Sequence, residues 1–157
     1  MTEPLHILVH CRKSEMIPAA TLIFKTLRTG FPEAPVYLWC NDRLCGEDAI
    51  HAAARETDAQ WVTPQCPLQH DHWIRYLIQT RRDPFWICDT DVVFWKRFEH
   101  APDPACDALA GVRMPAFYEP WTRTRYRERL HPCLMRIAPE HFKARTAAFA
   151  KKPENFP

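Results

Sequence analysis

Residues 84–95 read Pro-Phe-Trp-Ile-Cys-Asp-Thr-Asp-Val-Val-Phe-Trp. Four apolar residues follow Pro84 and run directly into Asp89, and four more follow Asp91. A short, aromatic-rich apolar run after a proline is typical of a buried strand. The pattern therefore predicts a strand that ends at two carboxylates with the spacing Asp-x-Asp.

This pair of carboxylates predicts a cation site. Desolvating a carboxylate costs several kcal/mol unless something pairs with it. Oxygen ligands suit Mg²⁺ or Mn²⁺, which proteins often hold with one or two carboxylates and the phosphates of a substrate. The alternative is an ordinary turn in which Asp89 and Asp91 are solvated, since Asp-Thr-Asp is good turn chemistry. The apolar runs on both sides favour the metal site.

The segments before this strand predict an α/β fold. Residues 5–10, 35–40 and 60–63 read as strands, and helices are expected at 14–30, 47–55 and 69–82. In the first helix Ser14 is the expected N-cap, and Met16, Ala20, Ile23 and Leu27 share one face. Alternating strands and helices predict a single domain, with a mostly parallel, Rossmann-like sheet flanked by helices. In such sheets, ligands bind beyond the carboxyl ends of the strands.

The helix at 69–82 carries an apolar stripe and a polar start. Trp73, like Trp86 and Trp95, is expected in the core because large aromatic residues usually pack. His70 and His72 bracket Asp71, which favours a solvated helix start over metal ligation for either histidine.

The second half of the chain predicts two more strands and a final helix. The strands are expected at 107–114 and 131–137, and Pro139 suits the first position of the helix. Between them, residues 115–130 predict a loop or helix over the carboxyl edge of the sheet. Its arginines could clamp a diphosphate or an anionic acceptor, or form a solvated face. We expect one domain over residues 1–150 and a C-terminal tail over 151–157.

Composition narrows the function classes. The chain has 157 residues, 46% of them hydrophobic, and a net charge of +2, which alone does not argue for a nucleic-acid or membrane partner. Interleaved arginine and aromatic residues also fit single-stranded nucleic acid, but the acidic residues leave no broad basic surface. Only 3 glycines are present, and neither a P-loop nor Gly-x-Gly-x-x-Gly occurs. A bound phosphate must therefore be held by metal, basic side chains or helix ends.

The compartment expected from the sequence is the cytoplasm. The N-terminus lacks the basic and apolar regions of a signal peptide, and no apolar run is long enough to span a membrane. The 7 cysteines are odd in number and form no Cys-x-x-Cys, which favours buried thiols over a disulfide framework. Their spacings also do not match a zinc finger or ribbon.

Two segments together carry a resemblance to a known family. The helix start His-Asp-His-Trp-Ile-Arg at 70–75 leads into the Asp-x-Asp strand, and His-Pro-Cys-Leu-Met-Arg-Ile follows at 131–137. This order resembles the nucleotide-sugar glycosyltransferases of the GT-A fold. The resemblance implies a compact GT-A-like domain that binds Mn²⁺ or Mg²⁺ and a UDP- or GDP-sugar donor. The implied activity is metal-dependent transfer of the sugar to an unknown acceptor.

The resemblance also implies roles for individual residues. Asp91 would be the direct metal ligand, and Asp89 would lie near the metal or the ribose. His131 would be a further metal or phosphate ligand. Cys11 and Arg12 would border the base of the nucleotide, and Asp42 would accept a hydrogen bond from the base. Arg75 would face the nucleotide from the helix before the motif. Glu119 would be the catalytic base if the reaction inverts configuration.

Two alternatives remain open at the level of sequence. The chain is short for the family after its last strand, so it could be a non-catalytic GT-A-like binding or assembly module. A homo-oligomer or a partner chain could also complete the acceptor site. A nucleotidyltransferase is disfavoured, because those enzymes usually rely on a glycine-rich phosphate loop.

Overall fold

The computed structural model describes residues 3–11, 13–40, 46–62, 70–99, 109–114, 117–119, 124–126 and 129–150. Among these residues no helix combines the length and the apolar character needed to cross a membrane.

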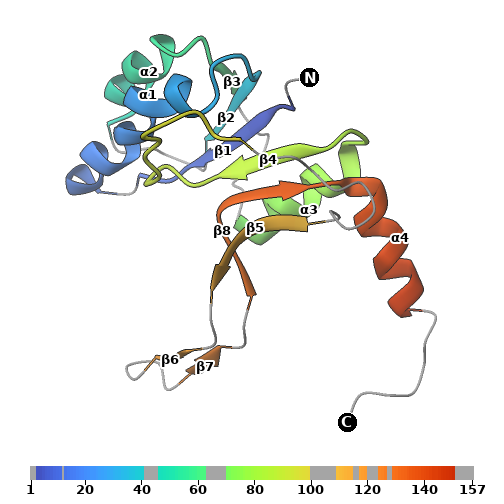
Figure 1. Ribbon diagram of the computed structural model, residues 1–157. Coiled ribbons are helices and arrows are strands. Elements are labelled where there is room, and N and C mark those ends of the chain that lie inside the picture. The colour runs from blue at the N-terminus through green and yellow to red at the C-terminus, as the bar shows by residue number, and fades with distance from the viewer. Residues whose placement is uncertain are drawn as a thin grey trace.

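One mixed sheet forms the centre of the molecule (Figure 1). Its six strands follow the order β3-β2-β1-β4-β8-β5. Neighbours among the first four strands pair in parallel, whereas β8 is antiparallel to both β4 and β5. Five strands therefore run in one direction, which confirms the predicted α/β class with a mostly parallel sheet. The strands are β1 (Leu5–Val9), β2 (Val36–Cys40), β3 (Gln60–Val62), β4 (Phe85–Cys88), β5 (Leu109–Met114) and β8 (Arg129–Ile137).

Helices cover both faces of the parallel part of the sheet. After the short 3-10 helix η1 (Ser14–Met16), α1 (Ile17–Gly30) packs with α2 (Glu47–Arg55) on one face. On the opposite face lies α3 (His70–Thr80), and α4 (Pro139–Ala150) follows β8 (Figure 1). Pro139 is the first residue of α4, as predicted.

Two hydrophobic clusters, one on each face, explain why β1 is apolar along its whole length. Leu5, Ile7 and Val9 pack with α1 and α2, whereas Leu8 packs with Trp73 and Leu77 of α3. All five residues of β1 are buried, as expected for a parallel strand between two helical layers.

The segment predicted as a loop or helix at 115–130 contains a hairpin instead. β6 (Phe117–Glu119) pairs antiparallel with β7 (Thr124–Tyr126) and lies beyond the ends of β5 and β8 (Figure 1). Tyr118 lies opposite Arg125, in the same register that pairs Met114 with Arg129. The Thr-Arg-Tyr run at 124–126 therefore belongs to a paired strand. The prediction of a loop or helix was wrong for the residues of this hairpin.

Two smaller expectations also fail. Ser14 is not an N-cap: it begins η1, where Lys13 occupies the cap position and no side-chain cap bond forms. Trp73 and Trp86 are buried as predicted, but Trp95 is 89% exposed. The chain turns at Thr90 and Asp91, and the apolar run after the turn does not form a strand, so Phe94 is buried while Trp95 faces solvent.

Candidate functional site

The site lies where the order in which the chain adds strands to the sheet reverses. From β1 the chain adds β2 and then β3 on one side, and β4 is then added on the other side of β1. The crossover helices α1 and α3 accordingly lie on opposite faces. In open α/β sheets, such a switch point leaves a crevice outside the carboxyl ends of the two central strands, where ligands bind. Here those strands are β1 and β4.

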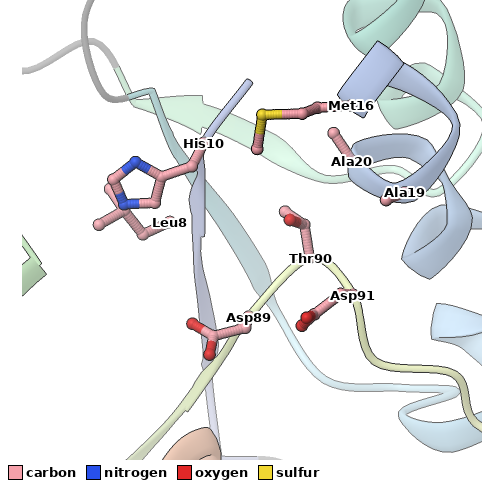
Figure 2. A pocket seen from close by; sticks show the side chains of 8 residues that line it. All are labelled: Leu8, His10, Met16, Ala19, Ala20, Asp89, Thr90 and Asp91. Carbon is pink, nitrogen blue, oxygen red and sulfur yellow. The ribbon is translucent and has the colours of Figure 1, made fainter. Parts of the chain in front are cut away.

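A pocket of about 320 Å³ occupies this position. β1 and the residue following it contribute Leu8 and His10, and the residues after β4 contribute the Asp-x-Asp motif (Figure 2). The start of α1 forms a third wall, which is apolar and mostly of small residues. The lining residues are Leu8, His10, Met16, Ala19, Ala20, Asp89, Thr90 and Asp91. The pocket is small for a ligand site but within the range that proteins use for small molecules.

Backbone contacts fix the position of Asp89. Its N–H donates to the carbonyl oxygen of Cys133 in β8 at 3.0 Å. The thiol of Cys88 donates to the Asp89 carbonyl at 3.3 Å. The backbone of the first aspartate of the motif is therefore held against β8.

The residues after Asp91 are anchored on α1. The N–H of Phe94 donates to the hydroxyl of Thr26 at 3.1 Å, and the N–H of Phe98 donates to the Gly30 carbonyl at 2.9 Å. The rings of Phe94 and Phe98 pack on Phe31, with centroids 5.3 and 5.5 Å away. The motif is thus held at both of its ends.

The electrostatic environment of the motif is negative. Burial raises the pKa of the Cys88 thiol well above its usual value, and the charges of Asp89 and Asp91 raise it further. Burial also raises the pKa of Cys133, and the charges of Asp89 and Asp91 add to the rise, although a hydrogen bond with the Leu134 backbone opposes it. These thiols are therefore neutral near pH 7, so they add no negative charge beside the two carboxylates.

A histidine from the opposite helix approaches Asp89. Nε2 of His70, the first residue of α3, lies 3.4 Å from Oδ1 of Asp89. Both side chains are partly exposed, His70 at 34% and Asp89 at 29%. His72, by contrast, is 61% exposed and approaches only its neighbour Asp71, at 3.8 Å. The solvated helix start expected from the sequence therefore describes His72 better than His70.

The other predicted site residues fall into three groups. Cys11 is buried in the cluster beneath α1, where its thiol donates to the Lys13 carbonyl at 3.5 Å, and Arg75 is exposed on α3. For Glu119, opposite Thr124 in β6–β7, and His131, opposite Val112 in β5–β8, only the backbone is described. Arg12 and Asp42 lie outside the described residues.

Sequence reasoning missed part of the pocket wall. Met16 was expected on the buried face of its helix, yet it is 39% exposed and lines the pocket with Ala19. His10 was treated as the last residue of a strand, although its position at a strand end is the same signal that identified Asp89. The small residues at the start of α1 form no sequence pattern that predicts a pocket.

A metal ion bound here would need ligands in addition to the side chains that the structure describes. In the described ranges, no cluster of three His, Cys, Asp or Glu side chains could hold a metal ion. Two carboxylates in a pocket open to solvent nonetheless fit a cation such as Mg²⁺ or Mn²⁺, which usually keeps several waters and takes the rest of its ligands from substrate phosphates.

Comparison with known proteins gives no relative: no family model, curated protein or solved structure matches the chain.

Proposed function

We propose that the chain is a metal-dependent glycosyltransferase that uses a nucleotide-diphosphate sugar, UDP- or GDP-linked, as its donor. The observation that carries this proposal is the position of Asp89 and Asp91. Both carboxylates line a pocket at the switch point of a mostly parallel sheet, at the carboxyl ends of the two central strands.

The chemistry of the pocket supports a diphosphate ligand held through a cation. The chain contains no glycine-rich phosphate loop, so its phosphate contacts must come from other groups. Asp91 and Asp89 would hold a divalent cation from one side, and the diphosphate oxygens would complete its coordination. His10 and Thr90 add groups to the same pocket that can donate hydrogen bonds to phosphate or ribose.

The opposite wall suits the uncharged part of the donor. Met16, Ala19 and Ala20 present apolar groups at the start of α1, across the pocket from the motif (Figure 2). A thioether and two methyl groups form a surface on which a flat ring or a sugar face can pack. The pocket thus combines an acidic end for a metal–diphosphate with an apolar wall for the remainder of the ligand.

In this mechanism the protein mainly binds and positions the donor. A cation bound at the motif would neutralise the charge that develops on the leaving diphosphate. The anchored backbone of Asp89 and the α1-bound segment after Asp91 keep the carboxylates in place, so little reorganisation is needed. An inverting reaction also needs a carboxylate base near the acceptor hydroxyl, for which Glu119 is our candidate.

The experiment that tests this function is a calorimetric titration of UDP and GDP, with and without Mn²⁺. We expect binding that requires Mn²⁺ and is lost in Asp91→Ala. Asp83→Ala is the matched control, because Asp83 is exposed in the loop before β4 and does not line the pocket.

Each outcome separates the alternatives. Binding of neither nucleotide in the presence of Mn²⁺ would contradict the proposal. Metal-dependent binding without turnover of any tested UDP- or GDP-sugar would favour the non-catalytic binding module. Turnover that falls in Glu119→Gln with unchanged nucleotide affinity would assign the base.

A further inference from the structure

We propose that the outer side of α1, together with the segment after the Asp-x-Asp motif, docks on the surface of a membrane that contains anionic lipids. The side chains that would contact the bilayer are Leu22, Lys25, Trp95, Lys96 and Arg97, which we call the Trp95 surface. Docking of this kind lies on the membrane and needs no spanning helix. The proposal does not rest on the proposed function, because a bilayer can be bound without any nucleotide.

The first argument is that the fold holds Trp95 in water. Trp95 is 89% exposed, more than any other large apolar side chain that the structure describes. The N–H of Phe94 donates to the Thr26 hydroxyl at 3.1 Å, and the N–H of Phe98 donates to the Gly30 carbonyl at 2.9 Å. The backbone is thus bonded to α1 on both sides of Trp95, so the indole is presented to solvent from a fixed position.

The second argument is that a further exposed apolar side chain lies beside this segment, which passes along α1 (Figure 1). Leu22 is 38% exposed and precedes Thr26 by one helical turn. Side chains four residues apart on a helix have Cβ atoms about 5–6 Å apart. Because Thr26 accepts the hydrogen bond of Phe94, the backbone at Trp95 lies close to the side of α1 that carries Leu22. Apolar groups that gather on a surface in this way mark an interaction site more often than scattered ones do.

The third argument is charge. Neither α1 nor residues 92–98 contain an acidic residue, whereas they contain four basic ones, Lys25, Arg28, Lys96 and Arg97. These two neighbouring segments therefore carry a formal charge of +4, against +2 for the whole chain. Arg28 donates to backbone carbonyls, and the other three basic residues are exposed. Positive side chains beside exposed apolar groups complement the negative headgroups of an anionic membrane.

The nearest acidic residues along the chain lie at the two ends of this surface. Asp91 lies in the pocket at the start of α1. Glu33 follows the last turn of α1, and Glu99 follows Phe98, which is bonded to Gly30 at that same end. The part of α1 between these ends, which includes Leu22 and Lys25, is therefore the part whose charge is positive.

The composition of the Trp95 surface favours a membrane over a protein or a nucleic acid. Tryptophan and leucine beside lysine and arginine are typical of proteins that lie in the membrane interface. Lysine is depleted in protein–protein interfaces, which disfavours a protein partner. Single-stranded nucleic acid stacks successive bases on several aromatic rings, whereas Trp95 is the one aromatic residue among the five that define this surface.

The docking surface lies near the candidate site. Ala19 of the pocket precedes Thr26 by seven residues, which is about 10 Å along the helix axis. Trp95 follows Asp91 by four residues, which span at most about 14 Å of chain. Docking through Trp95 would therefore bring the pocket close to the lipid headgroups.

Flotation of the untagged full chain with lipid vesicles tests the proposal. Vesicles of phosphatidylcholine alone would be compared with vesicles that contain about one-third phosphatidylglycerol. We expect binding to the anionic vesicles alone, and weaker binding as the salt concentration rises. Trp95→Ala should lower the partition coefficient about tenfold, and Lys96→Gln about fivefold. Tyr76→Ala is the matched control, because Tyr76 is an exposed aromatic residue of α3, on the opposite face of the sheet.

Brominated lipids give a second measurement that does not depend on a loss of affinity. Bromine on the acyl chains quenches the fluorescence of a tryptophan that enters the bilayer. We expect quenching in the native chain and none in Trp95→Phe, which should still bind because phenylalanine is also apolar and aromatic.

Three results would overturn the proposal: no binding of the native chain to anionic vesicles at low salt, unchanged binding in Trp95→Ala, or quenching that persists in Trp95→Phe. Trp95-dependent binding of a single-stranded oligonucleotide, without binding to vesicles, would overturn it in favour of a nucleic-acid ligand. Nucleotide binding with Mn²⁺ is measured without vesicles, so failure of the docking surface and failure of the proposed function are distinguishable.

Discussion

The indole N–H of Trp39 donates a 3.0 Å hydrogen bond to Nδ1 of His6 inside the sheet. His6 is completely buried, stacked on Tyr37 with ring centroids 5.0 Å apart and edge-on to Phe85. Because Nδ1 accepts this bond, the proton of the neutral ring is on Nε2, which has no hydrogen-bond partner among the residues that the structure describes. Burial, and secondarily the positive charge of Arg81, lowers the pKa of His6 to about 3.

The first prediction concerns stability at acidic pH. The pKa of an unfolded histidine is near 6.5, so between pH 6.5 and about 3 the unfolded chain binds a proton that the folded chain does not. The contribution of a neutral His6 is therefore fully present above pH 6.5 and is lost as the pH falls. We expect a loss of about 2 kcal/mol in the free energy of unfolding by pH 5, measured by urea denaturation.

The variant His6→Asn isolates this contribution. The amide oxygen of asparagine can still accept the Trp39 bond, but the side chain does not titrate. Its free energy of unfolding should depend less on pH than that of the native chain by the same amount. Parallel pH profiles of the two proteins would contradict the prediction.

The second prediction concerns the attachment of the Asp-x-Asp segment to α1. A Cβ on Gly30 would overlap the ring of Phe94, lying within 2.6 Å of its Cδ1 and 2.8 Å of its Cβ. Alanine in a helix gains up to about 1 kcal/mol over glycine. Overpacking costs about 1–3 kcal/mol, and Phe94 is buried, so the clash should dominate. We expect Gly30→Ala to lower the free energy of unfolding.

The neighbouring exposed residue provides the control. Thr29→Ala on the same turn should change stability by less than about 0.5 kcal/mol. Gly30→Ala should also weaken Mn²⁺-dependent nucleotide binding, because Phe94 follows Asp91 closely in the chain. Unchanged stability in Gly30→Ala would show that the Phe94 ring can move away freely.

Local sequence patterns predicted most of the sheet and its helices. The second helix was expected at 47–55 and spans Glu47–Arg55. The apolar run before Asp89 forms β4, Phe85–Cys88. These elements are short and are bounded by glycine, proline or charged residues. The spacing of their apolar residues and the helix- or strand-breaking residues at their ends therefore suffice to identify them.

The parts that could not be predicted depend on contacts between distant segments. The approach of His70 to Asp89 requires knowledge of where α3 starts relative to the end of β4. Trp95 has the same apolar character as Phe94, and only the packing of Phe94 under α1 decides which of them is buried. No local pattern contains that information.

The third prediction concerns Arg28, which joins three segments. Its guanidinium donates to the Thr57 carbonyl at 2.6 and 2.9 Å, to the Ala34 carbonyl at 2.8 Å and to the Phe31 carbonyl at 3.3 Å. Lysine cannot reproduce this planar fork. We expect Arg28→Lys to lower the free energy of unfolding by about 2–3 kcal/mol, whereas Arg82→Lys at an exposed position should have little effect. Equal stabilities of the two variants would refute the role of the fork.

The last prediction concerns a substitution that should weaken ligand binding in the pocket without changing the stability of the fold. Ala19 lines the pocket and is exposed at the start of α1, so a larger side chain there points into space that a ligand would occupy. Leucine is also a good helix former, and the change should leave stability within about 0.5 kcal/mol. We expect Ala19→Leu to weaken Mn²⁺-dependent binding of UDP or GDP at least tenfold in calorimetry. Ala52→Leu, at an exposed position of α2 away from the pocket, should bind like the native chain. Full affinity in Ala19→Leu would mean that the nucleotide does not contact this wall, and the apolar part of the donor would then have to lie elsewhere along the sheet edge.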